Sequence, residues 1–226
     1  MLKIEYTETA GWIPAIRGAR NPKNSWNLSD TSYGTGEAIA GDAPEIGPRD
    51  LKLLRNLGDA GSDHGKYLRM IQVYCDIEGP LYWLKEMDTY RVGVEKNSCS
   101  TMHKIHAKPF AMTDFSHDKL NLLGVNMLKV LVDQLEANRQ VYLETRDKKS
   151  WWQLIQLLPS SYNQRRTYMF SYAALKNIYH ARKHHKLDEW REFCKWVKTL
   201  PYAAELIIGG SDSDFIDFDF AAEDGR

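Results

Sequence analysis

The chain has little cysteine and no long apolar run, and both absences exclude particular classes of protein. Only three of its 226 residues are cysteines (Cys75, Cys99 and Cys194), and no CxxC pair occurs. An odd, widely spaced set excludes a disulfide framework or a zinc finger and suits a reducing compartment, so we predict a cytoplasmic protein. No stretch approaches the roughly 20 apolar residues that a membrane helix needs. The charged, alternating N-terminus does not resemble a signal peptide either, and we expect no membrane partner.

The chain also lacks an excess of charge of either sign. It has 30 basic and 30 acidic residues, so no global field draws it to DNA or RNA, and we expect neither as a partner. With 43% hydrophobic residues, a chain of this length can bury a full core. We predict one domain over residues 1–205 and an acidic C-terminal tail over residues 206–226, where six residues are acidic and one is basic.

The first half of the chain contains two predicted strands. One covers Leu2–Tyr6, and the other covers residues 68–78, where apolar and polar side chains alternate as in a half-buried strand. Between them, residues 21–48 are rich in Gly, Pro, Ser, Asn and Asp, which predicts a long loop. Asp50 is placed to cap a helix that ends near Gly58.

Helical patterns dominate the second half. Residues 118–145 predict one long helix, and a Trp-rich turn is expected after a break at 147–150. A second helix is predicted from Ser160 or Ser161 to about His184. Asp188 begins a third, with apolar residues at i, i+3, i+4 and i+7. Arg165 and Arg166 would then lie in the first turn of the second helix, where cations are disfavoured unless an anion binds.

The segment from Gly79 to Ile105 carries the most chemistry. A strand leaves through a Gly-Pro turn into a short aromatic helix, which leads to a polar loop with four functional side chains. These are Arg91, Asn97, Cys99 and His103. Many active sites place arginine, thiol and imidazole on a loop held by rigid elements, so this loop is a candidate site.

This segment resembles the core motif of the flavin-dependent thymidylate synthases. That motif reads Arg-His-Arg, seven residues, Ser, and Arg two positions later. Here the corresponding residues are Thr89-Tyr90-Arg91, then Cys99 and Thr101. Gly79-Pro80 stands where the family has Ala-Pro.

Four other segments resemble family motifs in the same order. Ile16–Arg20 is similar to Val-Arg-Ala-Ala-Arg, and Gly61–His64 is similar to a Gly-His turn with a two-residue insertion. Leu157–Pro159 is similar to Val-Leu-Pro, and Asn177 with Arg182 matches Asn-x4-Arg. The resemblance spans residues 10–200.

The resemblance implies an α+β fold, a twisted and mostly antiparallel sheet packed with long helices. It implies a homotetramer that binds FAD and methylates a pyrimidine nucleotide, dUMP to dTMP or a related one, with methylenetetrahydrofolate and NADPH as co-substrates. Each flavin site of the family is built from several subunits. Tyr82, Trp83 and Trp151 are expected at the interfaces, where aromatic residues concentrate.

The resemblance also implies roles for particular residues. It implies flavin contacts for four of them: His64, Arg91, Asn177 and Arg182. It implies nucleotide contacts for five: Glu86, Asn97, Cys99, Thr101 and Arg182. Arg91 and Cys99 are the implied catalytic pair.

Four positions lack an arginine or histidine of the family pattern, and Glu86 and Asn97 stand where the family has Gln and Glu. Thr89 and Tyr90 replace an arginine and a histidine, and Thr101 and Ile155 replace arginines used at the nucleotide phosphate. A charged hydrogen bond contributes about 1.5–3 kcal/mol, so these changes weaken the case for ordinary dUMP binding. Five cations could replace them: Lys96, His103, Lys104, His106 and Arg165. The alternative is a catalytically inactive protein that keeps the scaffold and binds a nucleotide or a protein partner.

Each candidate residue also has a simpler explanation. Cys99 is either a nucleophile that adds to the pyrimidine or a small packed thiol. Arg91 contacts a ligand or forms a surface ion pair, and His64 contacts a ligand or caps a turn. His103 and His106 have metal-ligand spacing, but no third ligand stands at a fitting distance along the chain, so we predict no metal.

Overall fold

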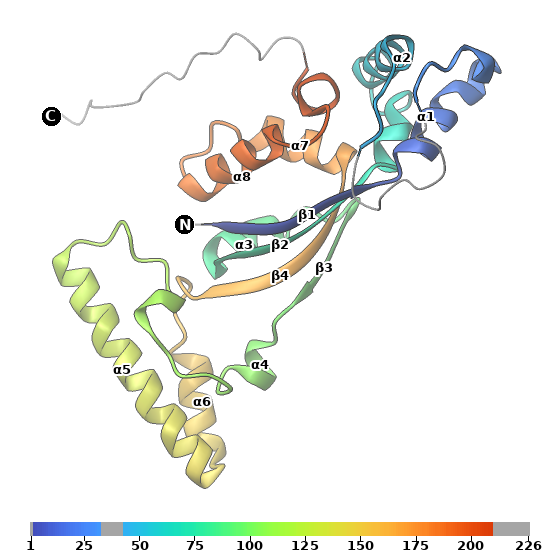
Figure 1. Ribbon diagram of the computed structural model, residues 1–226. Helices are drawn as coiled ribbons and strands as arrows, with labels where there is room; N and C mark the ends of the chain where they lie inside the picture. Colours follow the sequence, from blue (N-terminus) through green and yellow to red (C-terminus); the bar gives the residue numbers. More distant parts are fainter. Residues whose placement is uncertain (1, 33–42, 210–226) are drawn as a thin grey trace, which may run out of the picture. The chain divides into compact units, whose positions relative to one another are not determined.

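The protein is described by a computed structural model over residues 2–32 and 43–209, shown in Figure 1. Its strands are β1 (Lys3–Ala10), β2 (Gln72–Pro80), β3 (Val94–Ser98) and β4 (Asn163–Ser171). Its α-helices are α1 (Trp12–Arg20), α2 (Pro48–Asp59), α3 (Leu81–Met87), α4 (Thr101–Lys104), α5 (Leu122–Thr145), α6 (Lys148–Gln156), α7 (Tyr172–Arg182) and α8 (Asp188–Lys198). Short helices are η1 (Asn21–Lys23), η2 (Trp26–Leu28), η3 (Gly65–Arg69), η4 (Met112–Asp114) and the π-helix η5 (Ala204–Ile208).

Contacts within the chain define two compact units. The first contains residues 1–8, 73–170 and 184–193, and the second contains residues 9–72, 171–183 and 194–226. Each unit is formed from three separate stretches of sequence, so neither corresponds to one continuous segment. The single-domain boundary at residue 205 remains a prediction.

A four-stranded sheet with the order β1-β2-β4-β3 organises the first unit. β3 and β4 pair antiparallel, with Val94 opposite Phe170 and Ser98 opposite Arg166. The predicted alternation in β2 is confirmed, because Val73, Cys75 and Ile77 are buried while the residues between them are partly or fully exposed. The predicted α+β fold with a mostly antiparallel sheet is therefore confirmed.

Aromatic side chains form the core beside this sheet. The ring of Trp83, on α3, lies 5.1 Å from that of Trp190 and 5.9 Å from that of Phe193, on α8. Phe193 also contacts Phe170 of β4, with ring centroids 5.7 Å apart. Trp83 is fully buried in this cluster, so its predicted place at a subunit interface is wrong. The predicted apolar stripe of α8 is confirmed.

A second apolar cluster of the first unit lies between α5 and α6, which pack side by side (Figure 1). Leu128, Val132 and Leu135 of α5 meet Leu154 of α6 and Phe115 there. The predicted Trp-rich turn after 147–150 is wrong. Asp147 caps α6 by accepting a hydrogen bond from the Lys149 N–H at 3.2 Å, so the tryptophans lie on a helix.

The predicted helix from Ser160 or Ser161 is also wrong at its start. Residues 163–171 form the strand β4, and the helix begins only at Tyr172, where the Ser171 hydroxyl accepts from the Ala174 N–H at 3.2 Å. Gln164 and Arg166 occupy buried positions of β4. Because these polar residues stand where a half-buried strand normally has apolar ones, the alternation is hidden in the sequence.

The second unit is centred on Trp12, whose ring lies 5.1 Å from that of Tyr172 and 5.7 Å from that of Tyr202. Gly11 precedes this tryptophan with φ of 85°, and a Cβ there would lie 2.0 Å from the carbonyl oxygen of Met70. Only glycine fits this position, because both the space and the backbone angle exclude a side chain.

A buried ion pair in the second unit replaces the predicted cap at Asp50. Helix α2 begins at Pro48 after Gly47, so Asp50 lies within its first turn rather than before it. Asp50 is fully buried and accepts from Arg20 Nε at 2.5 Å and from Ser29 Oγ at 2.7 Å. Burial raises the pKa of Asp50, but hydrogen bonds from Thr31, Ser29 and Arg20 outweigh this effect and lower it.

The predicted loop over residues 21–48 contains short ordered elements. Within residues 21–48, η1 and η2 form, and Ser32 pairs with Glu45. Leu206 and Ile207 of η5 are buried. Residues 33–42 and 210–226, which include most of the predicted tail, lie outside the described residues. Over residues 2–32 and 43–209, no helix is long and apolar enough to cross a membrane.

Candidate functional site

Cys99 lies on the exposed segment that leaves β3. Its N–H donates to the Arg165 carbonyl at 3.0 Å, and its carbonyl accepts from Gln164 Nε2 at 2.6 Å. Both bonds tie the segment to the buried strand β4. The thiol is therefore exposed on a backbone that is held in place, whereas the prediction of a small packed thiol does not fit Cys99.

The predicted polar loop is shorter than expected, because ordered elements contain two of its residues. Asn97 belongs to β3, opposite Thr167, and His103 belongs to α4. Ser100 caps α4, its hydroxyl accepting from the His103 N–H at 3.1 Å. Thr101 is the first residue of that helix. Asn97, Cys99 and Thr101 thus follow one another at the end of an edge strand.

Arg91 lies before β3 and is exposed. Among residues 2–32 and 43–209 it has no ion-pair partner, and both interpretations of Arg91 remain predictions. The nearby carboxylate of Asp88 is instead paired with Lys96 and with Arg166, whose Nη1 lies 2.7 Å away. Burial raises the pKa of Asp88, but these two partners outweigh burial and lower it.

Glu86 is bound to the aromatic core of the first unit. Its carboxylate accepts from Trp190 Nε1 at 2.8 Å and lies 3.6 Å from His185 Nε2. A ligand at Glu86 would have to share a carboxylate that already holds α8 against α3. Its predicted nucleotide contact remains a prediction.

The two arginines at 165 and 166 lie on β4, so the prediction of an anion at a helix start is wrong for both. Arg165 donates to Asp76 Oδ2 from Nη2 at 2.6 Å, and Thr167 donates to the other oxygen of Asp76 at 2.6 Å. These hydrogen bonds lower the pKa of Asp76. Arg165 thus pairs with Asp76 of β2, and Arg166 pairs with Asp88, the residue that follows α3.

The other three predicted flavin residues belong to the second unit. His64 is exposed in the turn before η3, and Asn177 and Arg182 lie on α7, which packs against η3. Beside Asn177, the Lys176 Nζ donates to the carbonyl of Gly58 at 3.1 Å, which fixes α7 against the end of α2. Asn177 is exposed, whereas Arg182 is half-buried.

Of the four positions that lack a family arginine or histidine, two have structural roles. Tyr90 packs its ring 5.9 Å from that of Trp190, and Ile155 packs against the apolar cluster between α5 and α6. Neither position is open to an arginine or histidine without loss of that packing. Thr89 and Thr101 lie near the surface.

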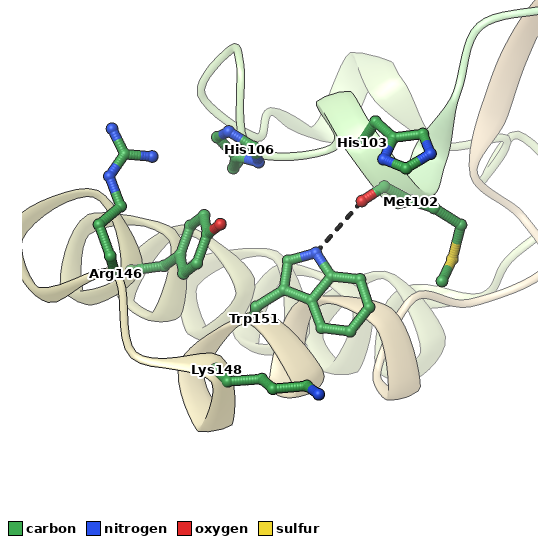
Figure 2. Close-up of a pocket in the computed structure, with 7 residues that line it drawn as sticks. Met102, His103, His106, Arg146, Lys148 and Trp151 are labelled. Carbon is green, nitrogen blue, oxygen red and sulfur yellow. Dashed lines mark hydrogen bonds between the residues drawn. The ribbon is translucent and has the colours of Figure 1, made fainter.

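Two basic residues of the candidate site, Arg146 and Lys148, were not predicted from the sequence. His103 and His106 line an open hollow of about 350 Å³ together with residues from α5 and α6 (Figure 2). Among the described residues, no group of three or more His, Cys, Asp or Glu side chains is arranged to hold a metal ion. The basic residues Arg146 and Lys148, close in sequence at the helix junction, were the signal that would have indicated this hollow.

Comparison with solved structures defines the fold. The chain is similar to two structures of the flavin-dependent thymidylate synthase ThyX from Helicobacter pylori, complexed with FAD and dUMP. They have TM-scores of 0.63 and 0.65 at 18% identity, over 91% and 92% of this chain and 97% of each of theirs. It is also similar to the UMP/dUMP methylase PolB from Streptomyces cacaoi bound with 5-Br dUMP, with a TM-score of 0.60 at 13% identity over 90% of this chain and 92% of that one.

These similarities show that the protein has the α+β fold of the flavin-dependent thymidylate synthases, as the sequence motifs predicted. At this low identity, no family model matches the sequence, and no curated protein sequence matches it either. The resemblance therefore rests on the similarity of the backbone fold and on the order of five short sequence motifs.

Proposed function

We propose that the protein is an FAD-dependent enzyme that methylates a pyrimidine nucleotide, dUMP to dTMP or a related nucleotide. The observation that carries this proposal is the fold, which covers nine-tenths or more of both chains in comparisons with enzymes crystallised with FAD and dUMP or with 5-Br dUMP. Methylenetetrahydrofolate as the one-carbon donor and NADPH as the reductant belong to the same proposal. A cytoplasmic location remains a prediction.

The side chains that are present suit a flavin ligand. Arg91 is exposed and unpaired over the described residues, so its guanidinium is available to a phosphate, and Asn177 offers an exposed amide. We assign Arg91, His64, Asn177 and Arg182 to flavin contacts. Bound flavin, once reduced, would supply the reducing equivalents that turn a transferred one-carbon unit into a methyl group.

We assign the nucleotide to the end of β3. Asn97 and Thr101 are hydrogen-bonding groups, and Cys99 exposes a thiol on a backbone fixed by β4. The thiol can approach the electron-poor carbon of a pyrimidine as a nucleophile. Glu86 and Arg182 are the other two proposed nucleotide contacts.

A second candidate function rests on Tyr90 and Ile155. Both occupy family positions where a cation or histidine is expected, and both are used in packing. A protein that keeps the fold without the chemistry, and binds a nucleotide or a protein partner, would show this replacement.

Calorimetry with FAD separates the two functions. Wild-type protein should bind FAD, and Arg91→Ala should weaken binding by about 1.5–3 kcal/mol if the contact is charge-assisted. Lys85→Ala, which removes an exposed cation from α3, is the matched control and should bind as the wild type does. Wild-type protein that binds dUMP but no FAD would support the second function instead.

A homotetramer is part of the proposal, and an exposed stripe on α5 supports it. Leu123, Met127 and Val130 are 68%, 66% and 70% exposed and follow one another at spacings of four and three residues. Val141 falls in the same register, after Gln134 and Ala137. This is the spacing of a helix that packs against another helix along a seam. Isolated soluble chains rarely expose so regular an apolar row, so we assign it to a subunit interface.

A further inference from the structure

Four of the seven residues that line the hollow between α4, α5 and α6 are basic. His103 and His106 lie on one side, Trp151 and Lys148 on the other, and Arg146 at one end (Figure 2). Among the described residues that line it there is no carboxylate. The nearest carboxylate in sequence, that of Asp147, caps α6 instead of lining the hollow, so the lining side chains favour a negatively charged ligand.

The hollow also has a fixed aromatic wall. Trp151 donates from Nε1 to the Met102 carbonyl at 3.2 Å, which joins α6 to α4. The ring of His106 lies 4.9 Å from that of Tyr142, and the guanidinium of Arg146 lies 5.6 Å above the same tyrosine. These contacts orient His106 and Arg146 along one wall of the hollow.

One ring nitrogen of His106 has no hydrogen-bond partner among the described residues. Its Nδ1 is buried and has no partner over the described residues. The backbone that carries it is fixed, because Arg139 Nη1 donates to the His106 carbonyl at 3.2 Å. Burial first, and then the charges of Arg146, Lys104 and Arg139, lower the pKa of His106. An anion in the hollow would offset the effect of those charges.

We propose that this hollow binds a phosphate group, the monophosphate end of a nucleotide, with Arg146, Lys148, His103 and His106 as its donors. The inference rests on the proposed function in that the nucleotide is the substrate assigned to Cys99. Met102 and His103 follow that cysteine by three and four residues, so the hollow begins at the end of β3 where we place the nucleotide. A volume of about 350 Å³ is at the lower end of ligand pockets, which suits a phosphate with part of a sugar.

The test compares two variants by calorimetry in the presence of FAD. Arg146 is at the C-cap of α5 with φ of 55°, a backbone angle that asparagine tolerates, so Arg146→Asn removes the cation without new strain. The test variant combines it with Lys148→Gln. Lys149→Gln is the control, because Lys149 is the next residue, is exposed and does not line the hollow.

The double variant should bind dUMP at least about tenfold more weakly than wild type, the loss of one charge-assisted hydrogen bond or more. The Lys149→Gln variant should bind dUMP as wild type does, and deoxyuridine, which lacks the phosphate, should bind all three proteins equally. Unchanged FAD binding by the double variant would show that it is folded. Equal dUMP affinity in the double variant and the wild type would overturn the inference.

Inorganic phosphate separates this inference from the proposed function. If wild-type protein binds phosphate but no dUMP, and the double variant loses phosphate binding, the hollow is an anion site and the nucleotide function fails. If wild-type protein binds neither dUMP nor phosphate, the inference itself is overturned.

Discussion

The ion pair between Glu136 and Arg139 on α5 should contribute strongly to the stability of the first unit. Arg139 is buried and donates to both oxygens of Glu136 at 2.8 Å. Glu136 also accepts from the Phe110 N–H at 2.9 Å, and Arg139 holds the His106 carbonyl. The pair therefore fixes the segment from His106 to Phe110 on α5. We predict that Glu136→Gln destabilises the protein.

The magnitude follows from the pKa of Glu136. The Arg139 hydrogen bond is the main cause that lowers it from 4.5 to about 2. At about 1.4 kcal/mol per pKa unit, this difference corresponds to roughly 3 kcal/mol in favour of the folded state. The Glu136 side chain is 27% exposed, so screening by solvent makes roughly 3 kcal/mol an upper value.

The pH dependence has a definite sign. The folded pKa is depressed, so this stabilisation is present above about 4.5, the unfolded value, and is lost as the pH falls towards 2. Urea denaturation at several pH values measures it. The difference in unfolding free energy between wild type and Glu136→Gln should be largest near pH 7 and should shrink between pH 4.5 and 2.

Glu144→Gln is the control, since Glu144 is exposed on the same helix. It should change the unfolding free energy by less than about 0.5 kcal/mol. A Glu136→Gln variant that lies within about 1 kcal/mol of wild type at pH 7 would refute the argument, because it would mean that Arg139 finds an equivalent partner or water without cost.

Three further predictions concern the second unit, the thiols and the assembly. Asp50→Asn should destabilise by about 3–5 kcal/mol in thermal unfolding, because it leaves the buried Arg20 unpaired; an unchanged midpoint would contradict this. In native protein a thiol reagent should modify Cys99 rapidly and Cys75 and Cys194 slowly, because burial raises the pKa of both buried thiols to about 12; fast reaction at Cys75 would show that its burial is wrong. Light scattering should give about four times the chain mass of 26.1 kDa, and a monomer would count against the α5 interface.

The alternating strand β2 and the apolar stripe of α8 were predictable because their patterns are local. In β2 the side chains alternate between the two faces of a sheet, and in α8 they repeat with the helical turn, so each pattern reports burial directly. The α+β class and its likeness to the flavin-dependent thymidylate synthases followed from five short motifs in order. Physical reasoning on single residues would not have indicated that family.

β4 and Asp50 were mispredicted because burial of polar groups depends on distant partners. Arg166 lies at a buried strand position because Asp88, 78 residues away, neutralises it. Asp50 is buried because Arg20 and the loop of Ser29 and Thr31 satisfy its carboxylate. A local pattern contains neither partner. It therefore predicted a helix for the residues of β4 and a helix cap for Asp50.

By itself, the sequence determined which residues can carry chemistry, namely the thiol of Cys99, the cation of Arg91 and the basic side chains after them. The tertiary structure alone decided which of these are free. It pairs Arg165 with Asp76 across two strands, leaves Arg91 unpaired over the described residues, and groups His103 and His106 with Arg146 and Lys148 around one hollow. The reason is that a charge becomes a site only through its neighbours in space, and packing of the sheet and helices sets those neighbours.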